Sequence, residues 1–122
     1  MQHKTIGLFP TGFVEFRLDY TDADINALIN SVEWVNHKQG YDDYPMYKIT
    51  KQNLHEDPAF KDISQKIISC AKIFCDQIGY QPHDLYITSM WINMFEGGQT
   101  IGPHTHTNSL ISGVYYLNTT PD

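Results

Sequence analysis

Apolar residues recur at helical spacing in a first stretch that begins after Thr21. They fall every three or four positions, at Ile25, Leu28, Ile29, Val32 and Val35. This spacing predicts an amphipathic helix that ends near His37–Gly40. Thr21 is followed three residues later by Asp24, a variant of the capping box that begins many helices.

A second, longer stretch has clearer boundaries. Asp57-Pro58 is a start signal, because Asp is a good N-cap and Pro is favoured at the first helical position. One apolar stripe follows, made of Phe60, Ile63, Ile67, Ala71, Phe74 and Ile78. Gly79 then supplies a residue suited to closing a helix. Between the two helices, residues 41–56 are polar and predict a loop with a short extended piece at Met46–Ile49.

Near both ends of the chain, the spacing of apolar residues changes to every second position, as in a strand. Thr5–Leu18 mixes β-branched and aromatic residues with Gly and Pro, which predicts a short strand, a turn and a strand. From Leu85 to Phe95 both alternating faces are largely apolar, so we expect a strand buried on both sides. A turn at Glu96–Gly98 then leads to extended segments at 101–107 and 109–118.

This order of elements predicts an α+β fold. N-terminal strands come first, two helices follow, and antiparallel strands complete the chain, so the helices are expected to pack on one face of a sheet. The 122 residues suit a single domain. Within it, residues 1–84 form a helical support region and residues 85–122 carry strands.

Composition disfavours one class of partner and indicates where in the cell the protein is found. The formal net charge is −6 and no cluster of Lys or Arg occurs, which makes nucleic acid an unlikely partner. No apolar run is long enough to cross a membrane, and no signal peptide is visible at the N-terminus. Cys70 and Cys75 point in different directions on the second helix, so we expect reduced thiols and a cytoplasmic location.

Candidate chemistry is concentrated around His104 and His106. Residues two apart on an extended chain project to the same face, so both imidazoles can converge on one cation such as Fe, Zn, Ni or Cu. Glycines and Pro103 precede the pair and allow a close approach of the backbone. Asn93 and Tyr116 add an amide and a phenol, which suit a small anionic ligand beside the cation.

These residues resemble a known family. The pattern Asn93-x-Phe95-x-x-Gly98-x-x-Ile101-x-x-His104-x-His106, followed by Ser112-Gly-Val-Tyr-Tyr-Leu117, is similar to the first half of the core of iron(II)/2-oxoglutarate-dependent oxygenases. It is most similar to a small group that includes bacterial and phage proteins. Phe9-Pro-Thr11 and the run Asp57–Ile63 also resemble that group.

The resemblance implies a double-stranded β-helix, or jelly roll, and a dioxygenase that oxidises a C–H bond while 2-oxoglutarate is decarboxylated. His104 matches the first metal ligand, and His106 stands where Asp or Glu is usual. Two neutral imidazoles remove one negative charge, which should weaken cation binding and leave the iron more electropositive. Alternatively, only one of the pair binds the metal, and a water or an exogenous ligand completes the coordination. Asn93 and Tyr116 match positions that bind 2-oxoglutarate, whereas Phe95 lacks a hydroxyl and can only pack.

The resemblance also implies parts that these residues do not contain. The family's late histidine ligand and the Arg or Lys that binds the distal carboxylate have no match after Tyr116, and the one Arg is Arg17. About three core strands are predicted, against roughly eight in a jelly roll. We therefore expect residues 1–122 to be the N-terminal part of a longer protein, active once further strands are supplied.

Two alternatives remain open from the residues. One is a catalytically inactive jelly-roll binding module, completed by a second copy in a homodimer. The other is a cupin-like protein that binds Zn or Ni through His104 and His106, with His55 or His83 as a third ligand. For the oxygenase, acidity leaves a small molecule or a protein side chain as the substrate.

Overall fold

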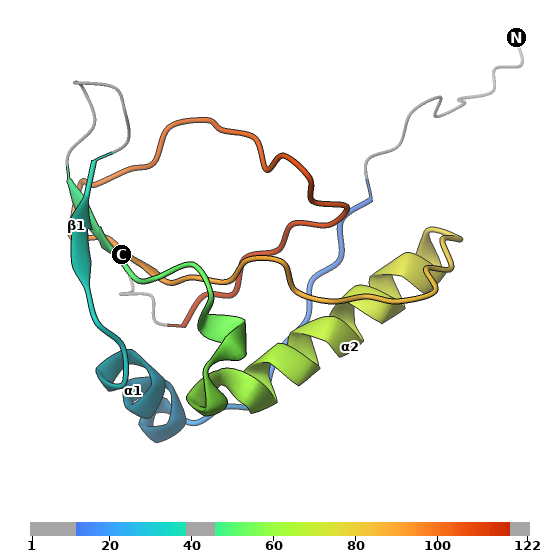
Figure 1. Ribbon diagram of the computed structural model, residues 1–122, viewed down its shortest axis with the longest axis horizontal. Helices are drawn as coiled ribbons and strands as arrows, with labels where there is room; N and C mark the ends of the chain where they lie inside the picture. The colour runs from blue at the N-terminus through green and yellow to red at the C-terminus, as the bar shows by residue number, and fades with distance from the viewer. Residues whose placement is uncertain (1–11, 39–45, 118–122) are drawn as a thin grey trace, which may run out of the picture.

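The computed structural model describes residues 12–38 and 46–117, and its architecture confirms the α+β class. The elements in chain order are α1 (Asp22–Asn30), β1 (Val35–His37), β2 (Tyr47–Ile49), the 3₁₀ turns η1 (Leu54–Glu56) and η2 (Pro58–Phe60), α2 (Lys61–Gln77) and β3 (Asn93–Met94). Both helices lie on one side of the molecule, the sheet stands at one end, and the long C-terminal segments spread over the opposite side (Figure 1).

Helix α1 begins where the sequence predicts and ends earlier. The Thr21 hydroxyl accepts from the Asp24 backbone N–H at 3.2 Å, and the Asp24 carboxylate accepts from the Thr21 N–H at 2.9 Å, so the capping box is confirmed. The expected extension to His37–Gly40 is wrong. Asn30 is the last helical residue and Ser31 is the C-cap. The Ser31 N–H is shared between the Ala27 and Leu28 carbonyls, and its hydroxyl donates to the Leu28 carbonyl at 2.8 Å.

The predicted start and end signals of the second helix are confirmed, with a 3₁₀ turn in place of the first helical residues. The Asp57 carboxylate accepts the Ala59 N–H at 3.1 Å and starts η2, which runs directly into α2. At the other end, Gly79 has a φ of 75° and donates its N–H to the Asp76 carbonyl at 3.1 Å. A left-handed residue at this position favours glycine, as expected from the sequence.

A small antiparallel sheet has the strand order β1-β2-β3. The extended piece predicted at Met46–Ile49 is confirmed as β2. It pairs with β1 in the register Val35↔Ile49 and His37↔Tyr47, and with β3 through Ile49↔Asn93. Strand β1 takes residues that the sequence assigned to the first helix, which agrees with the preference of β-branched Val35 for extended structure.

The hydrophobic core lies where η1, η2 and α2 meet. Leu54, Phe60 and Ile63 are almost completely buried and form one cluster. Each such side chain contributes about 1.5–3 kcal/mol relative to an exposed one. Partly buried side chains from all parts of the chain pack against the cluster: Leu18, Tyr20, Leu28, Val32, Ile67, Met90, Ile92, Tyr115 and Leu117.

Much of the strand structure expected near the two ends is absent. Residues 12–18 contain no strand, so that part of the N-terminal strand pair is wrong, and residues 5–11 lie outside the described residues. Of the strand expected at 85–95, only Asn93–Met94 is strand, and Tyr86 is 76% exposed. A strand is defined by backbone pairing, and a two-residue period does not supply a partner.

The two segments expected after the turn at Glu96–Gly98 are extended without being strands. Within residues 101–117, no stretch is assigned to a strand, and Asn118 lies outside the described residues. Asn108 has a φ of 62° and separates the two segments, as left-handed Asn often does in turns. The described residues therefore contain part of a β-structure, and a double-stranded β-helix is not visible in them.

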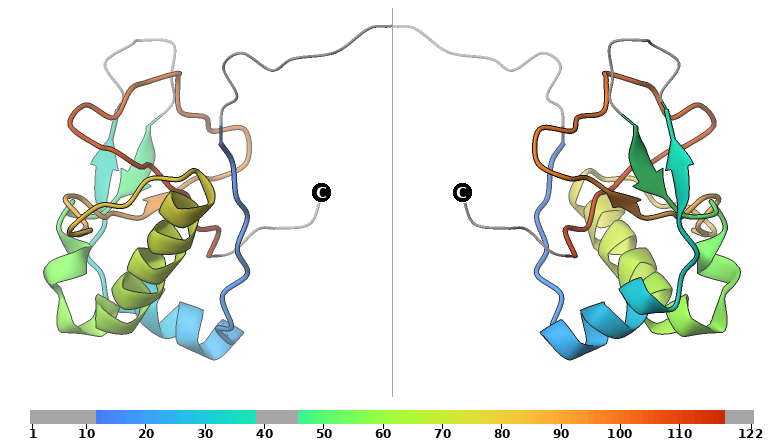
Figure 2. Two further views of the ribbon diagram at one scale, coloured as in Figure 1. Left: turned by 90° about the vertical axis from the view of Figure 1, so that its right-hand side faces the viewer. Right: turned by 90° about the vertical axis from the view of Figure 1, so that its left-hand side faces the viewer.

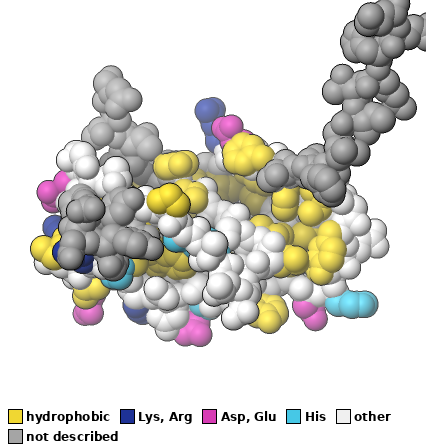
Figure 3. All heavy atoms as spheres, turned by 90° about the horizontal axis from the view of Figure 1, so that it is seen from above, with side chains coloured by type: hydrophobic (Ala, Val, Ile, Leu, Met, Phe, Trp, Pro, Cys, Tyr) yellow, Lys and Arg dark blue, Asp and Glu magenta, His cyan; other side chains and the backbone are white. Residues whose placement is uncertain are grey.

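The surface reflects this uneven packing. The side views show the C-terminal segments running above the helices (Figure 2). From above, hydrophobic side chains gather on the surface, with a recessed apolar area in the middle (Figure 3).

Cys70 and Cys75 are free thiols, as predicted. Among the described residues, no helix is both long and apolar enough to cross a membrane.

Candidate functional site

His104 and His106 lie next to each other, as their spacing predicts. Their ring centroids are 4.9 Å apart, and the rings meet edge to face. The Nδ1 atom of His104 lies 2.9 Å from the carbonyl oxygen of Gly102, which is buried. This geometry fits a tautomer in which Nδ1–H donates to the carbonyl, so Nε2 is the nitrogen left to bind a cation.

The separation of the two rings suits a shared ion. A divalent cation lies about 2.1 Å from a ligating imidazole nitrogen and therefore about 3.2 Å from the ring centre. Octahedral and tetrahedral angles at the ion then separate the two ring centres by about 4.5 to 5.2 Å. The observed 4.9 Å falls inside this range. The ring separation therefore permits the two exposed imidazoles to share one cation.

Hydrogen bonds hold the turn that precedes the histidine pair against the start of β2. The Gln99 side chain accepts the Glu96 N–H at 2.7 Å and donates to the Met46 carbonyl at 2.7 Å. Gly98, with a φ of 80°, completes the turn, which confirms the prediction at Glu96–Gly98. Sequence reasoning missed the role of Gln99, because its carbonyl partner lies 53 residues away and no local pattern indicates it.

Trp91 reaches the histidine pair from the core. Its ring centroid is 5.8 Å from that of His106, and the planes are inclined by 33°. No pattern in the sequence linked Trp91 to a histidine. The available signal was its place on the face of 85–95 that also carries Asn93 and Phe95.

Asn93, a predicted 2-oxoglutarate ligand, lies in β3. Asn93 as a whole is half-buried, and its Oδ1 atom is buried with no hydrogen-bond partner within the described residues. An amide of this kind can turn to present its NH₂ group instead, so it is able to serve an added acceptor such as a carboxylate. Phe95, on the same strand face, stacks on Tyr47 at 4.9 Å between centroids, which agrees with its expected packing role.

Tyr116, the other predicted 2-oxoglutarate ligand, is 75% exposed. Its hydroxyl has no hydrogen-bond partner in the described parts of the chain. The neighbouring Tyr115 instead turns toward the core, where its ring lies 6.4 Å from that of Tyr20. The structure thus brings together His104, His106 and Trp91, and leaves the Tyr116 ring on the surface.

A polar cluster fixes the position of Tyr20. The Tyr20 hydroxyl donates to the Asp62 carboxylate at 2.6 Å, and Lys66 lies 3.1 Å from Asp62 and 4.0 Å from the centre of the Tyr20 ring. The hydrogen bond from Tyr20 lowers the pKa of Asp62, and the bond to Asp62 raises the pKa of Lys66. Partial burial raises the pKa of the Tyr20 phenol. This cluster supports Tyr115 and, through it, the segment that follows the histidines.

A third protein ligand is not found in residues 12–38 and 46–117. No group of three His, Cys, Asp or Glu side chains there could hold a metal. His55 lies in η1 with a buried Nδ1 atom that lacks a hydrogen-bond partner in the same ranges. The third ligand of the cupin-like alternative is therefore supplied by neither His55 nor His83 in this structure.

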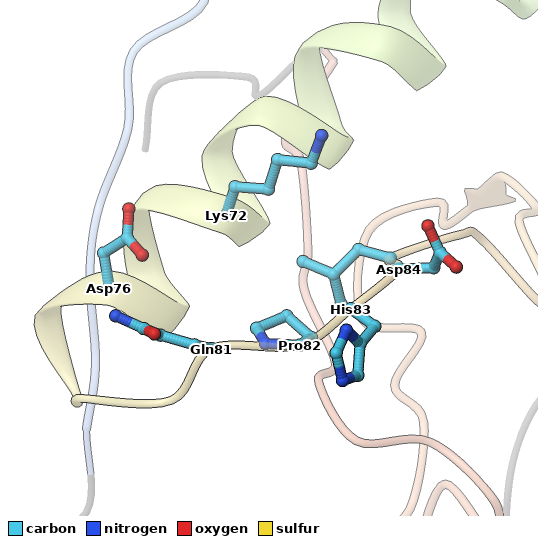
Figure 4. A pocket seen from close by; sticks show the side chains of 7 residues that line it. Lys72, Asp76, Gln81, Pro82, His83 and Asp84 are labelled. Atoms are coloured by element: carbon cyan, nitrogen blue, oxygen red, sulfur yellow. The ribbon is translucent and has the colours of Figure 1, made fainter.

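His83 instead borders an open depression of about 370 Å³ at the end of α2. Its lining comes from α2 and the segment after it, and includes Lys72, Asp76 and Asp84. Figure 4 shows the His83 ring and the Asp84 carboxylate pointing in opposite directions, as neighbouring residues of an extended segment do. The charged groups do not point toward a common position, so the depression lacks the arrangement of a ligand-binding site.

Comparison with known proteins gives one match. A family model described as "Putative 2OG-Fe(II) oxygenase" matches residues 89–122. No curated protein and no solved structure matches the chain. The matched residues include Trp91, Asn93, both histidines and Tyr116, so the resemblance to 2-oxoglutarate/iron(II) oxygenases is confirmed for the C-terminal part of the chain.

Proposed function

We propose that this chain is a domain of an Fe(II)/2-oxoglutarate-dependent oxygenase that oxidises a C–H bond of a small molecule or a protein side chain. His104 and His106 bind the iron, Asn93 contacts 2-oxoglutarate beside it, and Tyr116 contacts the distal carboxylate. The observation that carries the proposal is the imidazole pair, whose ring centroids are 4.9 Å apart. The family match over residues 89–122 supports the assignment of the cofactors.

The protein residues of such a site have distinct tasks. When bound, the iron supplies activation of O₂ and the oxidation of the substrate. His104 holds the cation through Nε2, with its other nitrogen fixed on the Gly102 carbonyl at 2.9 Å. Asn93 donates from its NH₂ group to the carboxylate of 2-oxoglutarate, once the amide turns to place that group where the Oδ1 atom is buried without a partner in the described residues.

The iron of this proposed site carries more positive charge than in the usual arrangement. A histidine replaces the carboxylate, so the protein neutralises less of the cation's charge. An anionic co-substrate compensates for that loss. We therefore expect the iron and 2-oxoglutarate to bind with positive coupling, each raising the affinity for the other by the same factor.

The proposed fold is a jelly roll whose first strands come from residues 85–117. Their two-residue period and extended course agree with this proposal, and β3 is one segment of it that is already paired. The side chains of Met90, Ile92, Tyr115 and Leu117, which pack against the core cluster, would then lie on the face of the sheet that the helices cover.

Calorimetry provides the test. We expect 2-oxoglutarate to bind in the presence of Mn²⁺ as an inert substitute for iron, and the signal to disappear in His104→Ala. His83→Ala is the matched control, since it removes an exposed histidine outside the site and should leave binding unchanged. With the further strands supplied, and with Fe(II) and O₂ present, succinate should form with the wild-type residues and not with His104→Ala.

The outcomes separate the proposal from its rivals. Failure of 2-oxoglutarate to bind at millimolar concentration with metal present would overturn the oxygenase assignment. Metal binding through His104 and His106 without 2-oxoglutarate binding would favour the metalloprotein alternative. A twofold mass in light scattering, with neither ligand bound, would favour the dimeric binding module.

A further inference from the structure

We propose that Trp91 is a positioning residue that holds His106 in the orientation needed to bind the metal. The inference rests on the proposed function, because it assigns a role in the same metal site. Its basis is the position of the Trp91 ring, 5.8 Å from the His106 ring and inclined to it by 33°. Aromatic pairs at such separations attract each other beyond simple burial.

Trp91 is well suited to this role because its backbone is held on both sides. Met90 donates its N–H to the Gln52 carbonyl at 2.9 Å and accepts from Leu54 at 3.0 Å. Ile92 accepts from the Thr50 N–H at 3.1 Å. The position of Trp91 is therefore fixed by the central part of the fold and does not depend on the histidine segment.

The direction of the Trp91 side chain follows from its neighbours. Met90 and Ile92 both pack against the core cluster. Successive side chains of an extended segment point to opposite faces, so Trp91 points away from the core. That face is the one on which His106 lies, as the contact between the two rings establishes.

The histidine segment has few other supports. Apart from Gly102, no backbone group of residues 100–117 makes a hydrogen bond within the described parts of the chain. The His106 ring contacts both Trp91 and His104, so the histidine pair is linked through Trp91 to the segment that packs on the core. Trp91 thus limits the rotation of the His106 ring before any metal arrives.

Pre-ordering of this kind raises the apparent affinity for the metal. The apparent affinity equals the intrinsic affinity multiplied by the fraction of molecules whose ligands are correctly oriented. An aromatic contact of ordinary strength changes that fraction by about 2- to 12-fold. Trp91→Leu should therefore weaken metal binding by a factor in that range, whereas Trp91→Phe keeps a stacking ring and should stay within about 2-fold of the wild type.

The experiment measures Co²⁺ binding to the full chain by calorimetry in the wild type, Trp91→Leu, Trp91→Phe, His106→Ala and Trp34→Phe. Trp34→Phe is the matched control, since it removes the chain's other tryptophan. Circular dichroism and the thermal midpoint check that each variant folds. We expect weaker binding in Trp91→Leu, rescue in Trp91→Phe, and no change in Trp34→Phe.

A second readout does not depend on the leucine variant folding. In Trp34→Phe all tryptophan emission comes from Trp91, and paramagnetic Co²⁺ bound beside it should quench that emission. Adding His106→Ala in this background should remove the quenching. Failure to quench in a protein that calorimetry shows to be metal-loaded would overturn the positioning role.

The two proposals fail in different ways. If Co²⁺ binding is unaffected by His106→Ala, the metal site itself is wrong. If His106→Ala abolishes binding while Trp91→Leu binds as tightly as the wild type, the metal site stands and the role of Trp91 is refuted.

Discussion

The packed centre of the molecule and its histidine-bearing segment are built in different ways. In the centre, Leu54, Phe60 and Ile63 are buried, and paired backbone from β2 and η1 surrounds them. In residues 100–117, Gly102 is the one buried residue, and the exposed side chains include Leu110, Val114 and Tyr116. Stability is therefore concentrated in one region and the candidate chemistry in the other.

This difference shows how a site can be ordered with little packing of its own. A few contacts link the segment to the centre. Trp91 contacts His106, Tyr20 contacts Tyr115, and Tyr115 and Leu117 pack against the core cluster at the segment's end. Just before its first residue, Gln99 bonds to Met46. Because these contacts are few, a substitution in the segment should change ligand binding far more than it changes the free energy of unfolding.

The largest expected effect is a loss of stability, which should differ sharply between two leucine substitutions. Leu54 is fully buried, whereas Leu110 is 65% exposed. Leu54→Ala should lower the free energy of unfolding by about 2–5 kcal/mol, through lost burial and the cavity left behind. Leu110→Ala should change it by less than about 0.5 kcal/mol. Urea denaturation followed by tryptophan fluorescence measures both, and equal losses would show that residues 100–117 are packed as tightly as the centre.

A smaller effect is expected at the start of α1. Thr21→Ala removes the hydroxyl that accepts the Asp24 N–H, and N-cap losses of this kind cost about 1 kcal/mol. Thr88→Ala, at an exposed position outside the helices, is the control and should be nearly neutral. Urea midpoints compare the two variants. A neutral Thr21→Ala would mean that α1 adds little to the stability of the centre.

Acid should lower the free energy of unfolding of the packed centre, because three carboxylates there are stabilised in their charged form. Hydrogen bonds from Thr21, from the Ala59 backbone and from Tyr20 lower the pKa values of Asp24, Asp57 and Asp62 respectively. Groups whose pKa is lowered by folding stabilise the protein above the usual value of 3.8 and lose that contribution as the pH falls through the folded pKa.

Urea midpoints at pH 5 and at pH 3 test this expectation. The midpoint should fall at pH 3, and the fall should be smaller in Thr21→Ala, which already lacks one of the bonds. Residues 100–117 contain no Asp, Glu, Lys or Arg, so this acid effect belongs to the centre. An equal fall in the wild type and Thr21→Ala would contradict the assignment to Asp24.

The parts of the fold that the sequence predicted correctly are those decided by local chemistry. The capping box at Thr21, the Asp57-Pro58 start and the Gly79 end each depend on residues a few positions apart. The wrong predictions concern the end of the first helix and the strands expected in residues 12–18 and 85–117. Strand formation in these two segments depends on a partner elsewhere in the chain. The same period of two is compatible with a paired strand and with an extended segment packed on a core.

The candidate site divides in the same way. The proximity of His104 and His106 follows from their spacing of two residues, so the sequence predicted it. The contacts of His106 with Trp91 and of Gln99 with Met46 join distant residues, and no local pattern specifies them. The predicted roles of Asn93 and Tyr116 remain predictions, because the bound co-substrate defines them.

The most direct test of the shared metal site is a double-mutant cycle on Co²⁺ binding, measured by calorimetry in the wild type, His104→Ala, His106→Ala and the double variant. If both imidazoles hold one ion, the wild type binds one Co²⁺ per chain at this site. Each single variant then loses nearly as much affinity as the double variant, with the thermal midpoint unchanged. Two ions per chain in the wild type, or two single losses that add up to the double loss, would contradict a shared site.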